Sequence, residues 1–345
     1  LACSHGHGTL TPGSRTLLLE LARSRKILFF GGKGGVGKTT ISAATALARA
    51  NEGAKVLLVS TDPAHNLGHL FDRKIGSKPV RLAVGLDGLE LDPAETVKLH
   101  LEEITNSLHR LMPIQLRSEV DKHMALSKDA PGMQEAAILE RIAEVVEQGT
   151  KDYDLIVFDT APSGHTARLM VLPEMMSAWT EGLIQRREKA DKFAEIVRGM
   201  GRDSSVEDKV FGNDAADEGK SRESGIRSLL NRRRLRFTSL RDKISDKNQT
   251  SFVIVLAAER LPVLETIELQ QQLKKGKISV DCLVVNKRSP IGEGEFLEER
   301  RSQEEAHMRT LIMALPKIPR QDLYLLAQDI VGMDALQAMA ERIAK

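Results

Sequence analysis

Short apolar runs alternate with segments of helical spacing along much of the chain. Residues 26–30 and 55–60 are two such runs, and residues 39–50 between them are rich in helix-forming Ala and Leu. A strand, a helix and a strand within about 35 residues form a βαβ unit with a right-handed crossover. Continuous apolar runs are typical of parallel strands that are buried on both faces. Further runs of this kind lie at residues 155–158, 252–256 and 282–285.

This alternation predicts an α/β fold with a doubly wound, mostly parallel sheet and helices on both faces. Two stretches, at about 94–150 and about 174–248, interrupt it and predict a helical subdomain that is formed by two insertions. Residues 1–24 are expected to be a flexible N-terminal segment, so that the α/β domain spans residues 25–345. The basic run at residues 232–236 is either a solvated helix face or a contact for a membrane surface or a partner.

Composition and charge narrow the class of protein. The 345 residues are 41% hydrophobic and 28% charged, which is usual for a globular protein. A net charge of +2 and only 3% aromatic residues argue against a nucleic-acid partner. No apolar run approaches the ~18 to 20 residues that span a bilayer.

Two cysteines, Cys3 and Cys282, cannot build a disulfide framework, so a cytoplasmic location is expected. Cys3, His5 and His7 form either a metal cluster or a mobile, glycine-rich terminus.

One segment carries a phosphate-binding motif between the first predicted strand and the first predicted helix. Glycines allow positive φ, which lets consecutive N–H groups turn toward phosphate oxygens at a helix N-terminus. Lys38 is expected to neutralise phosphate charge, and the Thr39 hydroxyl is expected to ligate Mg²⁺. The motif G-x-x-x-x-G-K-[ST] therefore predicts that ATP binds to Gly32, Lys33, Gly34, Gly35, Val36, Gly37, Lys38, Thr39 and Thr40.

Two aspartates follow predicted strands. Asp62 comes after the run at residues 55–60, and Asp159 comes after the run at residues 155–158. The carboxyl ends of parallel strands lie beside the nucleotide crevice in such a sheet. Asp62 is therefore expected to hold and deprotonate the attacking water, and Asp159 is expected to order Mg²⁺ through water.

Together these segments resemble a specific family of P-loop ATPases. The loop reads K-G-G-x-G-K-T, T-D-P-A-H-N occupies residues 61–66, and D-T-A-P-S-G-H-T occupies residues 159–166. P-G-x-x-E at residues 131–135 and a V-N pair that ends at Asn286 extend the likeness. These motifs are similar to those of the ATPases that drive arsenite pumps and of their relatives that target tail-anchored proteins to membranes. The resemblance covers residues 25–345.

The resemblance implies an ATPase with the P-loop fold that uses ATP and Mg²⁺ as a nucleotide-gated homodimer. In such a dimer Lys33 reaches the nucleotide of the facing subunit, and Asn286 contacts adenine. Lys33, Lys38 and Asp62 are then the catalytic residues. Two features depart from the family, because the chain has no C-x-x-C pair and no cysteine within its predicted helical insertions.

The resemblance also implies that ATP hydrolysis energises a membrane process. A transporter that exports a metalloid or another anion is the first candidate partner. Targeting of tail-anchored membrane proteins is the alternative. Methionines in or near the insertions either line a groove for apolar helices or fill the core. A partitioning or division-site ATPase is an alternative of another class. In each case the protein is expected in the cytoplasm, at most peripheral to a membrane. The apolar stripe at residues 333–345 has little basic content, which favours docking on the protein's own core over a membrane tail.

Overall fold

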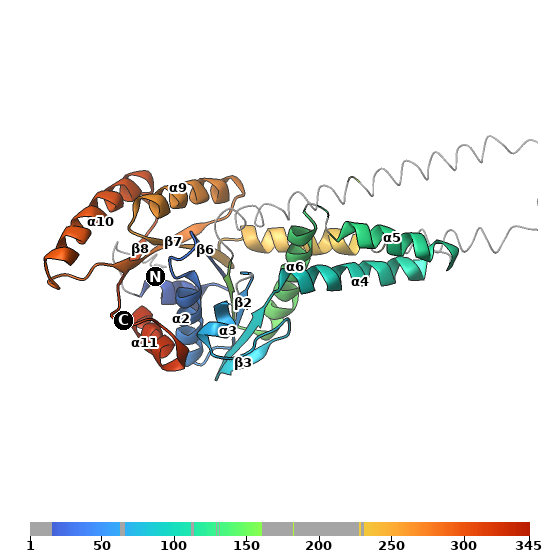
Figure 1. Cartoon of the computed structure of the whole chain (residues 1–345), viewed down its shortest axis with the longest axis horizontal. Coiled ribbons are helices and arrows are strands. Elements are labelled where there is room, and N and C mark those ends of the chain that lie inside the picture. The colour runs from blue at the N-terminus through green and yellow to red at the C-terminus, as the bar shows by residue number, and fades with distance from the viewer. Residues whose placement is uncertain are drawn as a thin grey trace, which may run out of the picture. The chain divides into compact units, whose positions relative to one another are not determined.

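The computed structural model describes residues 16–62, 66–111, 114–128, 130, 132–160, 182, 228 and 231–345. The chain divides into two compact units. The first unit contains a β-sheet, and the described part of the second is helical (Figure 1). The segments of the first are Leu1–Pro93, Val145–Val171 and Asp242–Lys345, and those of the second are Ala94–Glu144 and Leu172–Arg241.

An eight-stranded sheet forms the centre of the first unit (Figure 1). Its strands follow the spatial order β3-β4-β2-β5-β1-β6-β7-β8, and all neighbours are parallel except β3 and β4. The predicted α/β fold with a doubly wound, mostly parallel sheet is confirmed. In chain order the strands are β1 (Ile27–Gly31), β2 (Val56–Ser60), β3 (Val80–Ala83), β4 (Leu86–Glu90), β5 (Leu155–Asp159), β6 (Thr250–Ala257), β7 (Val280–Arg288) and β8 (Arg320–Tyr324).

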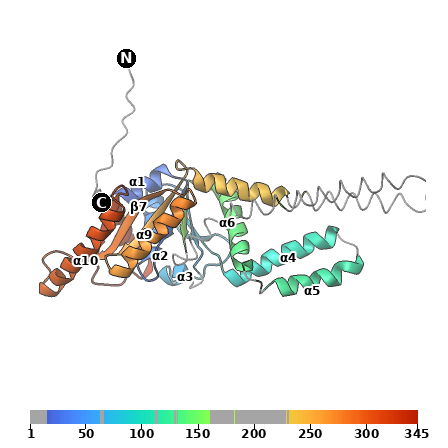
Figure 2. The same cartoon turned by 90° about the horizontal axis from the view of Figure 1, so that it is seen from above.

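Helices cover both faces of this sheet. On one face, buried residues of β1, β2 and β6 form a core with α1, α2, α3 and α11. On the other side α9 and α10 lie next to each other, as Figures 1 and 2 both show. The helices of this unit are α1 (Leu17–Ser24), α2 (Lys38–Asn51), α3 (Asn66–Leu70), α9 (Arg260–Lys275), α10 (Glu295–Ala314) and α11 (Gly332–Ala344).

An aromatic stack fixes the middle of the sheet. Phe29 of β1, Phe158 of β5 and Phe252 of β6 are fully buried. The ring centroids of Phe29 and Phe158 are 4.7 Å apart, and those of Phe29 and Phe252 are 6.3 Å apart. Stacked aromatic pairs at such distances contribute ~0.5 to 1.5 kcal/mol beyond the burial of their surface. The stack therefore holds β1 and β5 together just before the ends that carry the phosphate-binding motif and Asp159.

The two ends of the described chain pack on the same core. The prediction of a flexible segment over residues 1–24 is wrong for residues 17–24, which form α1. Leucines at positions 17, 18, 19 and 21 are buried there, and the Leu18 amide donates to Oε1 of Gln321 at 3.0 Å. Burial of four leucines against the core favours an ordered helix over a flexible segment. At the other end, Leu336, Ala340 and Ile343 bury the apolar stripe of α11, as predicted.

The described part of the second unit is helical. Its elements are α4 (Pro93–Leu111), a 3₁₀ turn (Ile114–Leu116), α5 (Arg117–Ser127) and the part of α6 (Met133–Asp152) up to Glu144. Residues 231–241 are also helical, and this helix continues to residue 245. Val97, Leu101 and Ala137 form a small core, against which Met124 and Met133 pack. Across all described residues, no helix is both long enough and apolar enough to cross a bilayer.

A buried charge cluster accounts for part of the basic run at residues 232–236. Nε of Arg233 lies 3.4 Å from Oε1 of Glu140, and Nη1 of Arg236 lies 3.0 Å from Oε1 of Glu144. Nδ1 of His100 lies 3.0 Å from Oε2 of Glu140. Burial alone would raise the pKa of Glu140, but its hydrogen bond with His100 and the two guanidinium groups hold that pKa below its usual value. Arg233 and Arg236 are therefore internal ion-pair partners rather than a solvated face.

Candidate functional site

The phosphate-binding motif forms the turn between β1 and α2. Gly32, Gly35 and Gly37 have φ of 144°, 80° and 93°, in the region that favours glycine. A Cβ on Gly32 would lie 2.0 Å from the carbonyl oxygen of Val255, and one on Gly37 would lie 2.5 Å from Nδ2 of Asn286. The turn thus needs glycine both for its backbone angles and for its close approach to β6 and β7.

Side chains from β7 fix the orientation of the loop. Nδ2 of Asn286 donates to the Val36 carbonyl at 2.9 Å, and Nζ of Lys287 donates to the Gly35 carbonyl at 3.1 Å. In a trans peptide the N–H points opposite to the C=O. The N–H groups of Val36 and Gly37 therefore face away from these two side chains. The predicted adenine contact of Asn286 stays a prediction, and the amide nitrogen contacts the loop in this structure.

Lys38 begins α2, and its side chain folds back over the loop. Nζ donates to the Lys33 carbonyl at 3.0 Å. The side chain is buried, which lowers the pKa of Lys38 below its usual value, while the negative charges of Asp159 and Asp62 oppose that shift. The ammonium group is thus held at the loop with a carbonyl oxygen as its acceptor. A phosphate oxygen is a stronger acceptor for such a group because it is charged.

Asp159 ends β5 directly beside the start of α2. Its Oδ2 accepts a hydrogen bond from Oγ1 of Thr39 at 2.7 Å. Among the described residues no group hydrogen-bonds to its Oδ1, although the carboxylate is fully buried. Burial raises the pKa of Asp159 to about 7, despite the Thr39 hydrogen bond and the charge of Lys38. A buried carboxylate oxygen without a donor is expensive unless a cation or a proton joins it.

The arrangement fits Mg²⁺ together with a polyphosphate. Mg²⁺ prefers oxygen ligands and usually combines one or two protein groups with phosphate oxygens and water. Thr39 and Asp159 supply a hydroxyl and a carboxylate of this kind. Within the described ranges, no group of three or more His, Cys, Asp or Glu side chains would hold a metal ion without such additional ligands.

Asp62 lies at the end of β2, next to the end of β5. The Thr61 amide donates to the Asp159 carbonyl at 2.9 Å, which joins the two strand ends. The Asp62 amide lies 3.3 Å from Oγ of Ser60, and its charge acts on both Lys38 and Asp159. The structure thus brings Asp62, Lys38 and Asp159 together, while Thr40 lies in the first turn of α2.

Several other predicted residues fall outside this cluster. Cys282 is fully buried in β7, as a small apolar side chain would be. Cys3, His5 and His7 lie outside the described residues, as do residues 63–65 and 161–166 of the two aspartate motifs.

Two residues at the loop were not predicted from the sequence. Lys287 follows the predicted Asn286 directly and has a φ of 58°, which is rare for a residue with a side chain. Glu265 on α9 pairs with Lys33, with 2.8 Å between Oε1 and Nζ. Glu265 lies on a helix far along the chain from the loop, and no pattern in the sequence indicates that it contacts Lys33.

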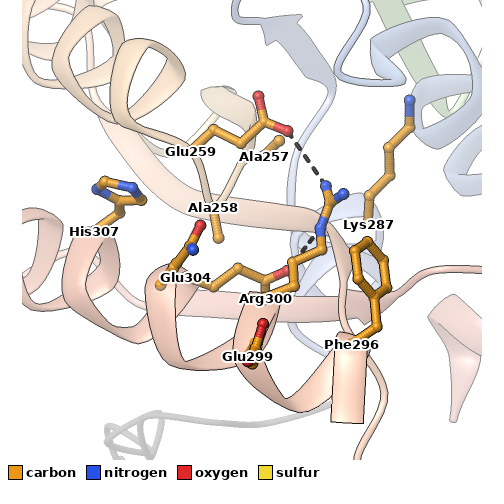
Figure 3. A pocket seen from close by; sticks show the side chains of 10 residues that line it. Ala257, Ala258, Glu259, Lys287, Phe296, Glu299, Arg300, Glu304 and His307 are labelled. Atoms are coloured by element: carbon orange, nitrogen blue, oxygen red, sulfur yellow. Dashed lines mark hydrogen bonds and ion pairs between the residues drawn. The ribbon is translucent and has the colours of Figure 1, made fainter. Parts of the chain in front are cut away.

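A cavity opens beside Lys287 at the carboxyl ends of β6 and β7 (Figure 3). Its volume is about 330 Å³, and α10 contributes Phe296, Arg300 and His307 to its wall. Arg300 reaches toward Glu259 in Figure 3, with 3.4 Å between Nη2 and Oε1. Acidic and basic side chains thus line the cavity together.

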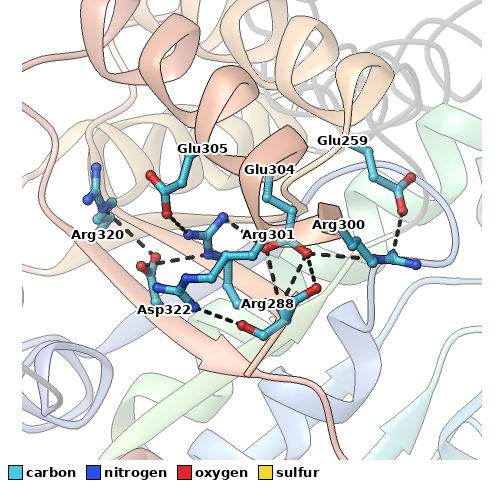
Figure 4. Close-up of polar contacts among 9 residues, drawn as sticks. Glu259, Arg288, Arg300, Arg301, Glu304, Glu305, Arg320 and Asp322 are labelled. Atoms are coloured by element: carbon cyan, nitrogen blue, oxygen red, sulfur yellow. Dashed lines mark hydrogen bonds and ion pairs between the residues drawn. The ribbon is translucent and has the colours of Figure 1, made fainter. Parts of the chain in front are cut away.

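Polar side chains hold α10 against the end of β7 (Figure 4). Arg288 is buried, and its Nη1 lies 3.0 Å from Oε2 of Glu304. Oγ of Ser289 donates to Oε1 of Glu304 at 2.7 Å, and Nη1 of Arg301 donates to the Ser289 carbonyl at 2.8 Å. Arg288 also pairs with Glu305. The network fixes the strand end from which Asn286 and Lys287 reach the loop.

Sequence comparison finds similarity to known ATPases along almost the whole chain. A family model described as anion-transporting ATPase matches residues 25–345. The chain is 32% identical to the ATPase ASNA1 homolog 2 of Paramecium tetraurelia, over 93% of this chain and 94% of that protein. It is 31% identical to the ATPase GET3A of Arabidopsis thaliana, over 92% of this chain and 84% of that protein. It is 30% identical to the arsenical pump-driving ATPase of Acidiphilium multivorum, over 90% of this chain and 48% of that protein.

Proposed function

The chain belongs to the anion-transporting ATPase family, and on this premise we propose that it works as a nucleotide-gated homodimer whose ATP hydrolysis energises a membrane process. The observation that carries the proposal is the buried Asp159 carboxylate, which is bound to Thr39 and lies near Lys38 at the glycine loop. Nucleotide binding follows from the family, and the roles of single residues are part of the proposal.

The loop residues bind and orient the triphosphate. N–H groups of the loop and the N-terminus of α2 hold phosphate oxygens, and Lys38 exchanges its carbonyl acceptor for one of them. Mg²⁺, when bound, neutralises phosphate charge. Thr39 and Asp159 would hold the ion, Asp159 through water. Such a water would supply the donor that Oδ1 of Asp159 lacks among the described residues.

Asp62 orients the attacking water and accepts its proton. It stands at the end of β2, close enough to influence the pKa of Lys38 and of Asp159. A positioned general base contributes roughly 10²- to 10⁴-fold to a rate. Lys33 of the facing subunit adds positive charge to the phosphates, which makes hydrolysis depend on dimer closure.

The Asp62→Asn variant tests this assignment. It keeps the size of the side chain and removes the base, so we expect kcat to fall by about 10²-fold or more while ATP affinity stays near that of the wild type. Steady-state phosphate release and equilibrium nucleotide binding measure the two quantities. A loss of ATP affinity as large as the loss of kcat would assign Asp62 to binding or folding instead.

A transporter that exports a metalloid or another anion is the partner we propose first. The family description and the similarity to the arsenical pump-driving ATPase support it. The chain has only Cys3 and Cys282, and Cys282 is buried, so a metalloid would need ligands other than paired cysteines.

A groove in the second unit favours a second candidate, the targeting of apolar membrane helices. It has a volume of about 550 Å³ and lies between α4 and α5. Leu101 and Met124 contribute apolar surface, and Lys98, Glu102 and Lys128 provide charge at its walls. A flexible methionine beside a leucine suits apolar helices of varied sequence.

Stimulated ATP hydrolysis distinguishes the two candidates. Arsenite, antimonite and a synthetic tail-anchor peptide are each added to the full chain, and phosphate release is followed. Stimulation by a metalloid that persists in Cys282→Ser supports the transporter, whereas stimulation by the peptide alone supports targeting and overturns our first choice.

A further inference from the structure

Lys33 is the loop lysine that we propose acts on the nucleotide of the facing subunit. Its Nζ lies 2.8 Å from Oε1 of Glu265, on the second turn of α9. About one third of each side chain is exposed, at 32% and 37%. The ammonium group that is proposed to serve the facing subunit is therefore engaged within its own chain.

We propose that Glu265 is a positioning residue that holds Lys33 in its own subunit until the nucleotide of the facing subunit takes its place. This inference rests on the proposed homodimer and deepens it, because it names the group from which Lys33 must be released. The ion pair then opposes dimer closure when no nucleotide is bound.

The backbones that carry Lys33 and Glu265 are both held in place, so the ion pair can break by movement of the lysine side chain alone. Pro262, Val263 and Thr266 are buried on α9, which fixes the helix that carries Glu265. On the loop, the Lys33 carbonyl accepts the hydrogen bond from Lys38. The backbone of Lys33 is thus held in place, and its four-carbon side chain is free to rotate from one acceptor to another.

The strength of the pair suits a reversible contact. A partly exposed ion pair is weak, since water and salt screen it. A triphosphate presents several negative charges in a closed interface, where a charge-assisted contact is stronger. Nucleotide in the facing subunit therefore outcompetes Glu265, whereas an empty facing site leaves Lys33 where the structure has it.

A double-mutant cycle on the full chain tests this inference. Sedimentation equilibrium measures the dimer dissociation constant of the wild type, Glu265→Gln, Lys33→Ala and the double variant, each with Mg²⁺ and a non-hydrolysable ATP analogue. Glu268→Gln is the matched control, because Glu268 is an exposed glutamate on the same helix that contacts Gln272 rather than the loop. Thermal unfolding checks that each variant is folded.

We expect Glu265→Gln to tighten the dimer about fivefold, because the two partly exposed ion pairs, one in each subunit, no longer oppose closure. Glu268→Gln is expected to leave the constant unchanged. In the Lys33→Ala background the Glu265→Gln change is expected to be silent, since no ammonium group remains to be released.

The outcomes separate the holding role of Glu265 from the trans role of Lys33. If Lys33→Ala weakens the dimer but Glu265→Gln has no effect, or acts equally with and without Lys33, the holding role is wrong and the trans role stands. If Lys33→Ala leaves the dimer constant unchanged, and mixed Lys33→Ala and Asp62→Asn dimers recover no activity, the trans role itself is wrong.

Discussion

Two buried carboxylates, one in each unit, differ in how many hydrogen-bond donors and positive charges surround them. Asp159 at the end of β5 has one hydroxyl donor and an oxygen with no donor among the described residues, and its pKa is raised to about 7. Glu140 on α6 is nearly as buried, yet it faces His100, Arg233 and Arg236, and its pKa is lowered.

The difference distinguishes a binding group from a structural one. A buried charge whose partners all lie in the chain is costly to separate from them, so it favours the fold in which those partners meet. A buried charge with too few partners destabilises the empty protein and is stabilised when a ligand supplies what is missing. This criterion supports our proposal that Asp159 belongs to the nucleotide site, whereas Glu140 belongs to the framework of the second unit. Substituting each carboxylate by its amide tests the distinction.

The largest effect is expected for Asp159→Asn. The amide still accepts the Thr39 hydrogen bond but cannot order a cation, so kcat should fall by about 10²- to 10³-fold. Because the change also removes a poorly compensated buried charge, the melting temperature of the nucleotide-free protein should stay the same or rise. Phosphate release and calorimetry measure the two effects. A large drop in melting temperature would show that Asp159 stabilises the fold instead.

Glu140→Gln is expected to act on stability rather than on activity. The change leaves two arginines near a neutral group, and loss of one partner from a buried ion-pair cluster costs about 3 kcal/mol. Urea unfolding of the second unit, compared with that of the exposed Glu119→Gln on α5, measures the cost. Basal ATP hydrolysis per folded molecule should not change. Equal stability of both variants would show that the cluster contributes little.

The smallest effect concerns the pH dependence of stability, which should have opposite signs for the two groups. The raised pKa of Asp159 means that the folded protein holds a proton that the unfolded chain loses near pH 4, so stability falls as pH rises toward 7. The loss is about 2 kcal/mol between pH 5 and pH 7. The pKa of Glu140 is lowered, so this group contributes to the free energy of unfolding at pH values above its pKa in the unfolded chain. That contribution is lost as the pH falls through its pKa in the folded protein.

Urea unfolding of nucleotide-free protein at several pH values measures both slopes. Asp159→Asn should abolish the decline between pH 5 and pH 7, and addition of Mg²⁺ with the ATP analogue should reduce it in the wild type. A decline that survives in Asp159→Asn would have to come from another titrating group.

The sequence predicted the features that local pattern determines. Continuous apolar runs revealed β1, β2, β5, β6 and β7, and the spacing from Gly32 to Thr39 revealed the loop, because both signals lie within a few neighbouring residues. The strands β4 and β8, which also pair in parallel, were missed because polar residues interrupt them. The partners of these residues were harder to predict. Lys33 and Glu265 are separated by more than 200 residues, and only the position of α9 beside the loop brings them together. Likewise, nothing near Arg233 in the sequence indicates that Glu140 is its partner.

The order of the strands has a consequence for how this protein is made. β1 lies between β5 and β6, and Ile27 pairs with both Ile156 and Thr250. A ribosome that adds about 5 to 20 residues each second needs ten seconds or more to synthesise the chain between Ile27 and Thr250. During that time the apolar strand β1 lacks a neighbour on at least one side and is a target for aggregation or for a chaperone. The glycine loop at its end therefore leaves the ribosome early but gains its final shape only after β6 has followed.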